Sequence, residues 1–229
     1  MSSEPRSDER SRVNVFVHVN HREGEPRLGI LMCVNGTGIT YRWLRDLLGG
    51  EERGWDYPRM NEEAASVPRG AEGLMVFPFG NGAERTLENR NPGASLHGLD
   101  FNLHRRPHLL RAAQEGVVFA LNRGLEIMRG MGAEAERVRA GKANMFLSPL
   151  FREIFAAVTG AVLEIYDTDG AQGAARGAGL GAGIYGDVEE AFRGLALETT
   201  LEPDPRLSET YREIYGRWRA RLEEMLGPA

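Results

Sequence analysis

Three glycine-containing loops are the places in this 229-residue sequence where backbone amides could hold a ligand. The first, Asn-Gly-Thr-Gly at residues 35–38, lies between an expected strand and an expected helix. The amide groups of such a loop, together with the N-terminus of the following helix, can bind an anion such as phosphate. A plain tight turn could have the same sequence, so the local residues leave the role of this loop open.

The second loop, Ala-Gly-Lys-Ala-Asn at residues 140–144, follows an expected strand and precedes a helix that Ser148 would cap. Ligands of open α/β sheets bind beyond the carboxyl ends of the strands. Lys142 is the single lysine of the chain, beside 27 arginines. A compact ammonium differs from a planar guanidinium in reach and geometry. The lysine is therefore either required at this position or retained by chance, and we weigh the two equally.

The third loop, at residues 168–175, opens a segment rich in glycine and alanine that we expect to be helical. Each glycine destabilises a helix interior by about 1 kcal/mol relative to alanine. So many glycines indicate a close approach of the helix to the sheet or to a ligand, and we expect packing on the sheet to be the cause.

Several classes of protein are excluded by what the sequence lacks. It contains no Walker-type phosphate loop, no dinucleotide-binding fingerprint, no His-Glu-x-x-His and no Gly-x-Ser-x-Gly. The five histidines are not at metal-ligand spacing, so we predict no metal site. The only cysteine, Cys33, excludes an internal disulfide. It lies in the apolar run 28–34, where we expect a buried thiol on a strand.

Charge and hydropathy limit the partners. The formal net charge is −5, so neither a basic surface for nucleic acid nor a polybasic membrane patch is expected. No apolar run reaches 18 residues, and the first dozen residues are polar, which predicts neither a membrane span nor a signal peptide. We expect a cytoplasmic protein.

The elements that must position these loops alternate between strand and helix. We expect strands at 13–19, 27–35, 73–79, 138–140 and 161–166, and helices at 39–48, 60–66, 107–131, 149–158, 170–185, 187–193 and 205–226. The first two strands form an antiparallel hairpin, the second helix is capped near Asn61, and residues 1–12 form a disordered tail. Residues 80–103 form one long loop, which is usually functional in a compact domain. This order predicts an α/β domain with a mixed sheet and flanking helices.

Several motifs, in the right order, resemble the FGGY family of carbohydrate kinases. Residues 80–86, Gly-Asn-Gly-Ala-Glu-Arg-Thr, resemble the Gly-Glu-Arg-Thr loop of that family, and residues 94–99 and 108–115 resemble its second signature. The one departure is Gln114, where the pattern has an apolar residue. Residues 148–154 and 169–175 also resemble the family. Within the family, the branch that this chain resembles most looks like the xylulokinases.

The resemblance implies a domain of the actin-like, RNase H-like ATPase fold. In this family two such domains flank a cleft. The resemblance covers about residues 13–200 and implies that residues 13–229 form the C-terminal, nucleotide-binding domain. The resemblance implies that the N-terminal domain, which in the family binds the sugar and supplies the catalytic aspartate, is absent here, so we expect no catalytic residue in this chain. Carried over by position, Gly38 lies near the nucleotide phosphates and Gly141 begins the adenosine loop. Lys142, Ala143 and Asn144 replace glycines of that loop, and Asn144 and Ser148 could bond the nucleotide, although Ser148 could equally be a plain helix cap.

The activity implied is transfer of the γ-phosphoryl group of ATP, with Mg²⁺, to a hydroxyl of a xylulose-like sugar. The sugar would bind only together with an N-terminal domain, so we expect the isolated chain to be inactive. An exposed apolar side should then bind a separate N-terminal kinase half or a second copy of the chain. Two alternatives remain open: a non-catalytic nucleotide-binding or interaction module, and an inert truncated fragment.

Overall fold

The strands lie in three small sheets in the computed structural model, which describes residues 2–18, 21–50 and 52–227. In the first sheet β1 (Asn14–Val17) and β2 (Leu28–Leu31) are antiparallel. In the second, β3 (Met75–Phe79) and β4 (Gly93–His97) are antiparallel. In the third, β5 (Arg137–Gly141) runs parallel to β6 (Val162–Tyr166), and β6 pairs antiparallel with β7 (Leu197–Leu201).

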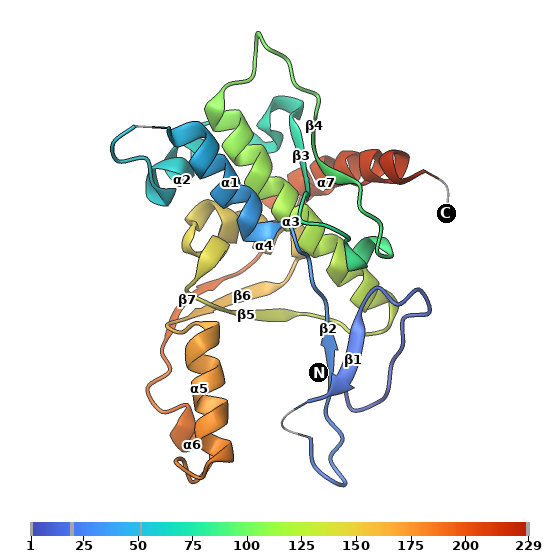
Figure 1. Cartoon of the computed structure of the whole chain (residues 1–229), viewed down its shortest axis with the longest axis vertical. Coiled ribbons are helices and arrows are strands. Elements are labelled where there is room, and N and C mark those ends of the chain that lie inside the picture. Colours follow the sequence, from blue (N-terminus) through green and yellow to red (C-terminus); the bar gives the residue numbers. More distant parts are fainter. Residues whose placement is uncertain (1, 19–20, 51, 228–229) are drawn as a thin grey trace.

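Seven α-helices are assigned within the described residues, and the longest, α3 (Arg106–Gly130), runs through the middle of the molecule (Figure 1). The others are α1 (Thr37–Gly49), α2 (Tyr57–Ala65), α4 (Pro149–Thr159), α5 (Gly170–Gly181), α6 (Val188–Ala191) and α7 (Pro205–Leu226). Short 3₁₀ helices span Arg69–Gly73, Arg85–Leu87 and Asn144–Leu147. Since α3 packs against β3 and against α1, α2 and α4, it joins the elements that position the candidate loops.

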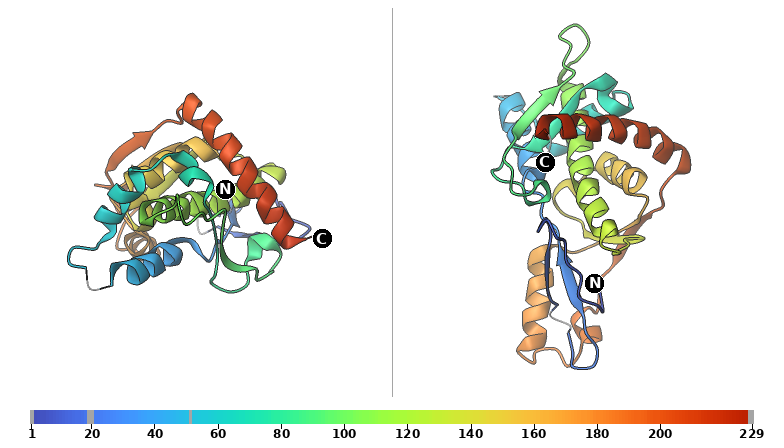
Figure 2. Two further views of the ribbon diagram at one scale, coloured as in Figure 1. Left: turned by 90° about the horizontal axis from the view of Figure 1, so that it is seen from above. Right: turned by 90° about the vertical axis from the view of Figure 1, so that its right-hand side faces the viewer.

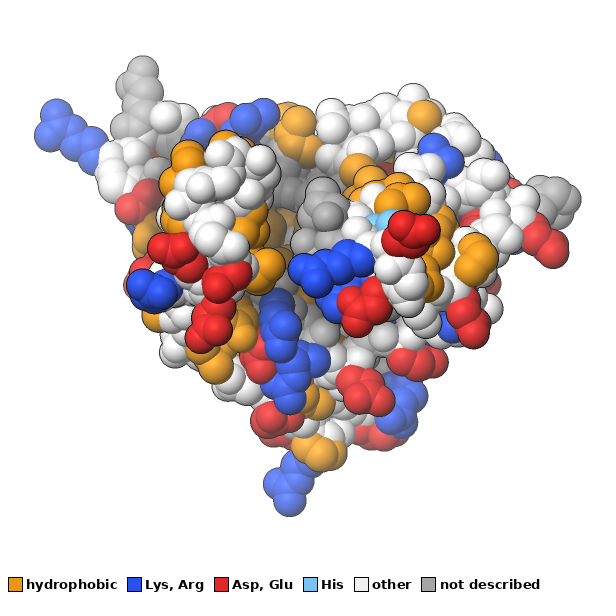
Figure 3. Space-filling view, turned by 90° about the horizontal axis from the view of Figure 1, so that it is seen from below, with side chains coloured by type: hydrophobic (Ala, Val, Ile, Leu, Met, Phe, Trp, Pro, Cys, Tyr) orange, Lys and Arg blue, Asp and Glu red, His pale blue; other side chains and the backbone are white. Residues whose placement is uncertain are grey.

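Two projections extend from the same end of the molecule, away from α3. One is the β1–β2 hairpin and the other consists of α5 and α6 (Figures 1 and 2). Seen from that end, a hollow separates the projections, and hydrophobic side chains gather around it (Figure 3). Large exposed hydrophobic residues of these segments are Phe16, Val17 and Leu31 on the hairpin and Ile184, Val188 and Phe192 around α6. In the part of the chain that is described, no helix is both long and apolar enough to cross a membrane.

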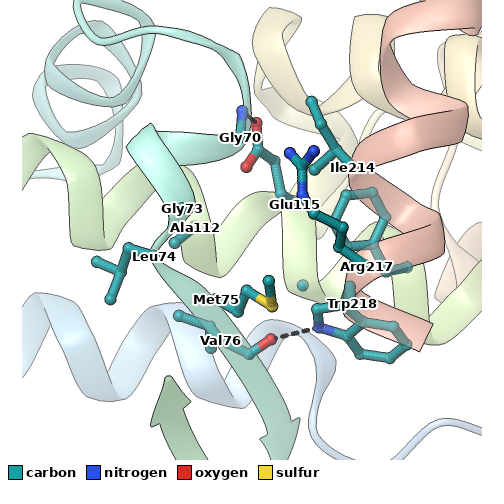
Figure 4. A pocket seen from close by; sticks show the side chains of 12 residues that line it. Gly70, Gly73, Leu74, Met75, Val76, Ala112, Glu115, Ile214, Arg217 and Trp218 are labelled. Carbon is teal, nitrogen blue, oxygen red and sulfur yellow. Dashed lines mark hydrogen bonds between the residues drawn. The ribbon is translucent and has the colours of Figure 1, made fainter. Parts of the chain in front are cut away.

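The core brings α7 onto α3 and β3. Trp218 of α7 stacks on Phe77 with ring centroids 4.9 Å apart, and its Nε1 donates a hydrogen bond to the carbonyl of Val76 at 2.9 Å (Figure 4). The helix α3 approaches the same carbonyl closely, because a Cβ atom at Gly116 would lie 2.2 Å from Val76 O. Glycine is therefore needed at 116 for α3 to pack on β3.

A buried polar cluster connects the same elements. Glu115 accepts hydrogen bonds at its Oε1 from the backbone nitrogen of Gly70 at 2.9 Å, from Arg111 Nε at 3.0 Å and from the Tyr211 hydroxyl at 3.0 Å. Figure 4 shows Glu115 directed toward Gly70 beside a cavity of about 10 Å³, which is room for one water at most. Burial raises the pKa of Glu115, while its three donors oppose the shift. The cluster joins α3 to α7 and to the turn before β3.

Several expectations from the sequence are wrong in detail. The predicted loop 80–103 contains the short helix 85–87 and the strand β4, and the strand β7 is an element that the sequence pattern does not predict. The helix α2 begins at Tyr57 because Asp56, rather than Asn61, accepts the capping hydrogen bond from the backbone of Arg59. Cys33 is exposed rather than buried, because β2 ends at Leu31.

The glycines of α5 do not pack on the sheet. Cβ atoms built at Gly170, Gly173 and Gly177 would meet no atom within 4 Å, because α5 lies in one of the projections. The expected disordered tail carries several contacts: Ser2 bridges to Leu28, and Arg6 donates a hydrogen bond to Met131 O.

Candidate functional site

A cavity of about 690 Å³ lies among α1, α2, α3 and the segment 144–151. Ligand-binding cavities are typically about 300–1,000 Å³, so this one has the size of a cofactor site. Its lining residues are Thr37, Gly38, Ile39, Tyr41, Arg42, Tyr57, Asn61, Val117, Leu121, Asn144, Met145, Phe146, Leu147, Ser148 and Phe151.

The loop before α1 reaches the cavity because it is tied to β3 and to the loop at residues 80–86. A Cβ atom at Gly36 would lie 1.3 Å from Pro78 O, so glycine is required for this close approach. The backbone nitrogen of Asn35 donates a hydrogen bond to Glu84 Oε2 at 2.9 Å, and the Asn35 side chain donates to Ala83 O at 2.8 Å. These contacts place Gly38 and the positive end of the α1 dipole at the cavity.

The loop after β5 enters the cavity only at its far end. Gly141 is the last residue of β5, and a Cβ atom there would lie 2.4 Å from Thr168 O. Lys142 Nζ forms an ion pair with Glu198 Oε1 at 2.8 Å, with the lysine side chain 45% exposed. Asn144 adopts φ 51° and begins the 3₁₀ turn that leads to Ser148. The tight backbone at Gly141 thus directs Asn144 and Ser148 to the cavity.

Three of the five residues predicted from the sequence therefore share one cavity. Gly38, Asn144 and Ser148 line it, although about one hundred residues of sequence separate the first from the other two. Gly141 and Lys142 do not belong to the lining. The alternative interpretation of Ser148 as a helix cap is confirmed, because its hydroxyl accepts a hydrogen bond from Phe151 N at 3.2 Å and caps α4.

Sequence reasoning missed a buried polar network in the cavity wall. Gln114 donates from Nε2 to the Tyr41 hydroxyl at 2.9 Å and to Asn61 Oδ1 at 3.0 Å, and its Oε1 accepts from Ser148 Oγ at 2.9 Å. Burial raises the pKa of Tyr41, so its hydroxyl stays protonated and donates to Asn61. The signal for this network was Gln114 itself, a polar residue where the motif has an apolar one.

The lining suits binding better than bond-making chemistry. Aromatic and aliphatic side chains form much of the wall, and the polar groups are amides, hydroxyls and the guanidinium of Arg42. None of the lining residues is acidic, histidine or cysteine, so no general base faces the cavity. In the described part of the chain, no group of three His, Cys, Asp or Glu residues could hold a metal ion.

Known proteins are similar to this chain in both sequence and fold. The sequence model of the FGGY family of carbohydrate kinases, C-terminal domain, matches residues 1–184. The chain is 31% identical over 176 residues to the L-xylulose/3-keto-L-gulonate kinase of Escherichia coli (strain K12), covering 75% of this chain and 34% of that kinase. It is 29% identical over 203 residues to the xylulose kinase of Haemophilus influenzae, covering 85% of this chain and 39% of that enzyme. The solved xylulose kinase of Rhodospirillum rubrum superposes with a TM-score of 0.74 at 25% identity, covering 96% of this chain and 43% of that one.

The fold is thus that of an actin-like, RNase H-like ATPase domain, as expected. The chain belongs to the FGGY family of carbohydrate kinases, and the matched region is the C-terminal domain of that family. It spans between 34% and 43% of the length of the three relatives described.

Proposed function

We propose that this chain is the ATP-binding half of a xylulokinase-like carbohydrate kinase. The observation that supports this most directly is the cavity of about 690 Å³, where Gly38 at the start of α1 meets Asn144 and Ser148. A helix N-terminus attracts phosphate groups, and aromatic walls accept a flat base, so the two kinds of surface fit the two ends of a nucleotide.

Each residue of the proposed site has a different task. The amides around Gly38 would bind phosphate oxygens, and Asn144 would donate a hydrogen bond to the nucleoside. The Ser148 hydroxyl, whose proton is given to Gln114 Oε1, would accept one. Gly141 allows the tight turn that directs the loop. Lys142 could reach a phosphate or the ribose only by leaving Glu198, to which it is paired at 2.8 Å.

Phosphoryl transfer would need groups beyond this chain. Mg²⁺ neutralises the charge that develops on the phosphoryl group. Because the cavity lining carries no carboxylate, the ion would be bound through the phosphates of ATP and by residues of an N-terminal half. That half would also bind the xylulose-like sugar and supply the aspartate that accepts the hydroxyl proton.

An N-terminal kinase half could bind to an exposed apolar surface of this chain. Both projections carry exposed hydrophobic residues, such as Phe16 and Val17 on the hairpin and Ile184 between α5 and α6. Hydrophobic side chains gather around the hollow between the projections (Figure 3). Monomeric proteins rarely leave large apolar patches uncovered. We propose that an N-terminal kinase half covers this surface, with self-association as the alternative.

Calorimetric titration with MgATP tests nucleotide binding. Gly38→Glu is the sharpest variant, because a Cβ atom there meets nothing within 4 Å and an acidic residue in the first turn favours the helix. We expect wild type to bind MgATP, and Gly38→Glu to bind at least about tenfold more weakly through repulsion of the phosphates. Gly216→Glu, at a helical glycine of α7 with equally open space, is the matched control and should bind normally. Failure of wild type to bind would favour an inert fragment.

A coupled assay with xylulose separates an enzyme from a binding module. We expect no sustained phosphorylation by the purified chain, because loss of a general base alone costs about 10²–10⁴ in rate. Activity should appear when an N-terminal kinase half is added. Nucleotide binding without activity in that mixture would favour the non-catalytic module.

A further inference from the structure

Gln114 is fully buried next to the cavity, at 0% exposure. Both polar groups of its side chain, the amide nitrogen and the amide oxygen, are hydrogen-bonded. Its three partners come from three elements: Tyr41 from α1, Asn61 from α2 and Ser148 from the cap of α4. All three partners line the cavity, whereas Gln114 does not. The side chain therefore acts on the cavity through other residues.

The hydrogen bonds have a fixed direction. Ser148 Oγ accepts from Phe151 N at 3.2 Å and gives its single proton to Gln114 Oε1. This turns Gln114 Nε2 toward Tyr41 and Asn61. Asn61 Oδ1 then accepts two hydrogen bonds, one from Gln114 at 3.0 Å and one from the Tyr41 hydroxyl at 3.1 Å.

The Asn61 amide nitrogen is the donor that remains. Within the residues that the structure describes, both side-chain hydrogen bonds of Asn61 are accepted by Oδ1, which leaves Nδ2 without a partner. Asn61 is partly exposed in the cavity wall. The rings of Tyr41 and Tyr57 line the same cavity and stack with their centroids 6.1 Å apart. A neutral donor beside aromatic rings suits an uncharged acceptor of a base or ribose rather than a phosphate.

We propose that Gln114 is a positioning residue that holds Asn61 Nδ2 as a hydrogen-bond donor to the nucleoside of a bound nucleotide. This inference rests on the proposed nucleotide site. It also gives a reason for a buried amide at a position where the family motif has an apolar residue: the amide sets the orientation of Asn61, which an apolar side chain could not do.

Asn61→Asp tests the donor without dismantling the network. An aspartate keeps an oxygen to accept from Gln114 and Tyr41, but it presents an acceptor where Nδ2 was a donor. We expect MgATP to bind about three- to tenfold more weakly, the range for one lost hydrogen bond. Magnesium tripolyphosphate, which has no nucleoside, should lose affinity only through repulsion by the added carboxylate, and therefore less than MgATP does. Asn102→Asp, on an exposed loop outside the cavity, controls for the added negative charge.

Gln114→Leu and the double variant test the positioning role. Gln114→Leu should weaken MgATP but not tripolyphosphate, and Asn61→Asp/Gln114→Leu should lose no more affinity for MgATP than Asn61→Asp alone, because both changes remove the same contact. Additive losses, or equal losses for both probes, would overturn the positioning role. Equal affinity of wild type for the two probes would overturn this inference while leaving a phosphate site intact. Absence of binding of either probe to wild type would overturn the proposed function and this inference together.

Discussion

Glu84 Oε2 accepts a hydrogen bond from the backbone nitrogen of Asn35 at 2.9 Å, which joins the loop at residues 80–86 to the loop that opens α1. The carboxylate residue is 1% exposed, and its Oε1 accepts from the Thr86 hydroxyl at 3.2 Å. A motif that resembles a signature of the family thus has a structural role in this half of the protein: it fixes the position of the glycine loop at the cavity.

Glu84→Ala should lower both stability and nucleotide affinity. The change leaves the Asn35 amide without its acceptor, and an unsatisfied buried donor costs about 1–3 kcal/mol. Glu84→Gln should be milder, because its oxygen can accept from Asn35 while its nitrogen donates to Thr86. Urea unfolding and MgATP titration check the order wild type, Gln, Ala. Equal unfolding free energies for all three would contradict it.

Gly36 and Gly38, in the same loop, should respond oppositely to alanine. Gly36→Ala places a Cβ atom 1.3 Å from Pro78 O, so the loop must move, and we expect a loss of at least about 2 kcal/mol. Gly38→Ala meets no atom within 4 Å and lies in a helix, where alanine is preferred, so its stability should not fall. Thermal unfolding measures the contrast, since 1 kcal/mol shifts the midpoint by about 2–4 °C in a domain of this size. Similar midpoints for the two variants would be inconsistent with a close approach of Gly36 to Pro78.

Substitutions at Lys142 and at Glu198 can show whether Lys142 binds the nucleotide or only pairs with Glu198. If Lys142 serves the nucleotide, Lys142→Ala should weaken MgATP binding by roughly 1.5–3 kcal/mol, the value of a charged hydrogen bond. Glu198→Gln should strengthen binding, because it releases the lysine from its ion pair. Neither change should alter stability by more than about 1 kcal/mol, since exposed ion pairs contribute little. Unchanged affinity in both variants would leave Lys142 as a surface ion pair only.

The unfolding free energy should fall as the pH drops below the ordinary histidine value because of His97. Partial burial, and then the charge of Arg221, lowers the pKa of His97 from 6.5, and its Nδ1 accepts from Arg221 Nε at 3.1 Å. The unfolded chain therefore binds this proton at higher pH than the folded chain does. The stability is fully present above pH 6.5 and is lost as the pH falls toward the lowered value.

His97→Gln should remove that part of the pH dependence, because glutamine can accept from Arg221 at any pH. Urea unfolding on either side of the ordinary histidine pKa measures the difference, with His21→Gln in the exposed hairpin turn as the control. A slope that is the same in wild type and His97→Gln would show that other groups account for it.

The helices could be predicted from the sequence because their caps are local. Ser148-Pro149 and Asp204-Pro205 begin α4 and α7 at the expected residues. The strands β4 and β7 could not be predicted in this way, because each is five residues long and exists through pairing with β3 or β6, elsewhere in the chain. Cys33 was misplaced for a related reason: its apolar run continues beyond the end of β2.

The lining of the cavity was predictable where it consists of loops. Gly38, Asn144 and Ser148 were found through glycine content, position after strands and resemblance. Tyr41 and Asn61 were not found, since their place in the wall follows from hydrogen bonds with Gln114 that span 73 and 53 residues. Hydrogen bonds between residues so far apart leave no local sequence pattern. The one sign of them in the sequence was Gln114, an amide at a position where the family motif has an apolar residue.

The helix α7 is part of the folded core of this chain but lies outside the residues that the family model matches. The family match ends at residue 184, whereas α7 spans Pro205–Leu226 and supplies Trp218 to the rings of Phe77 and Phe119. A reading frame that stopped at the end of the match would still be recognised as a kinase segment. It would nevertheless leave the central helix uncovered and Glu115 without its tyrosine partner. The region that the family model matches is therefore shorter than the stretch of chain that builds the core of this domain.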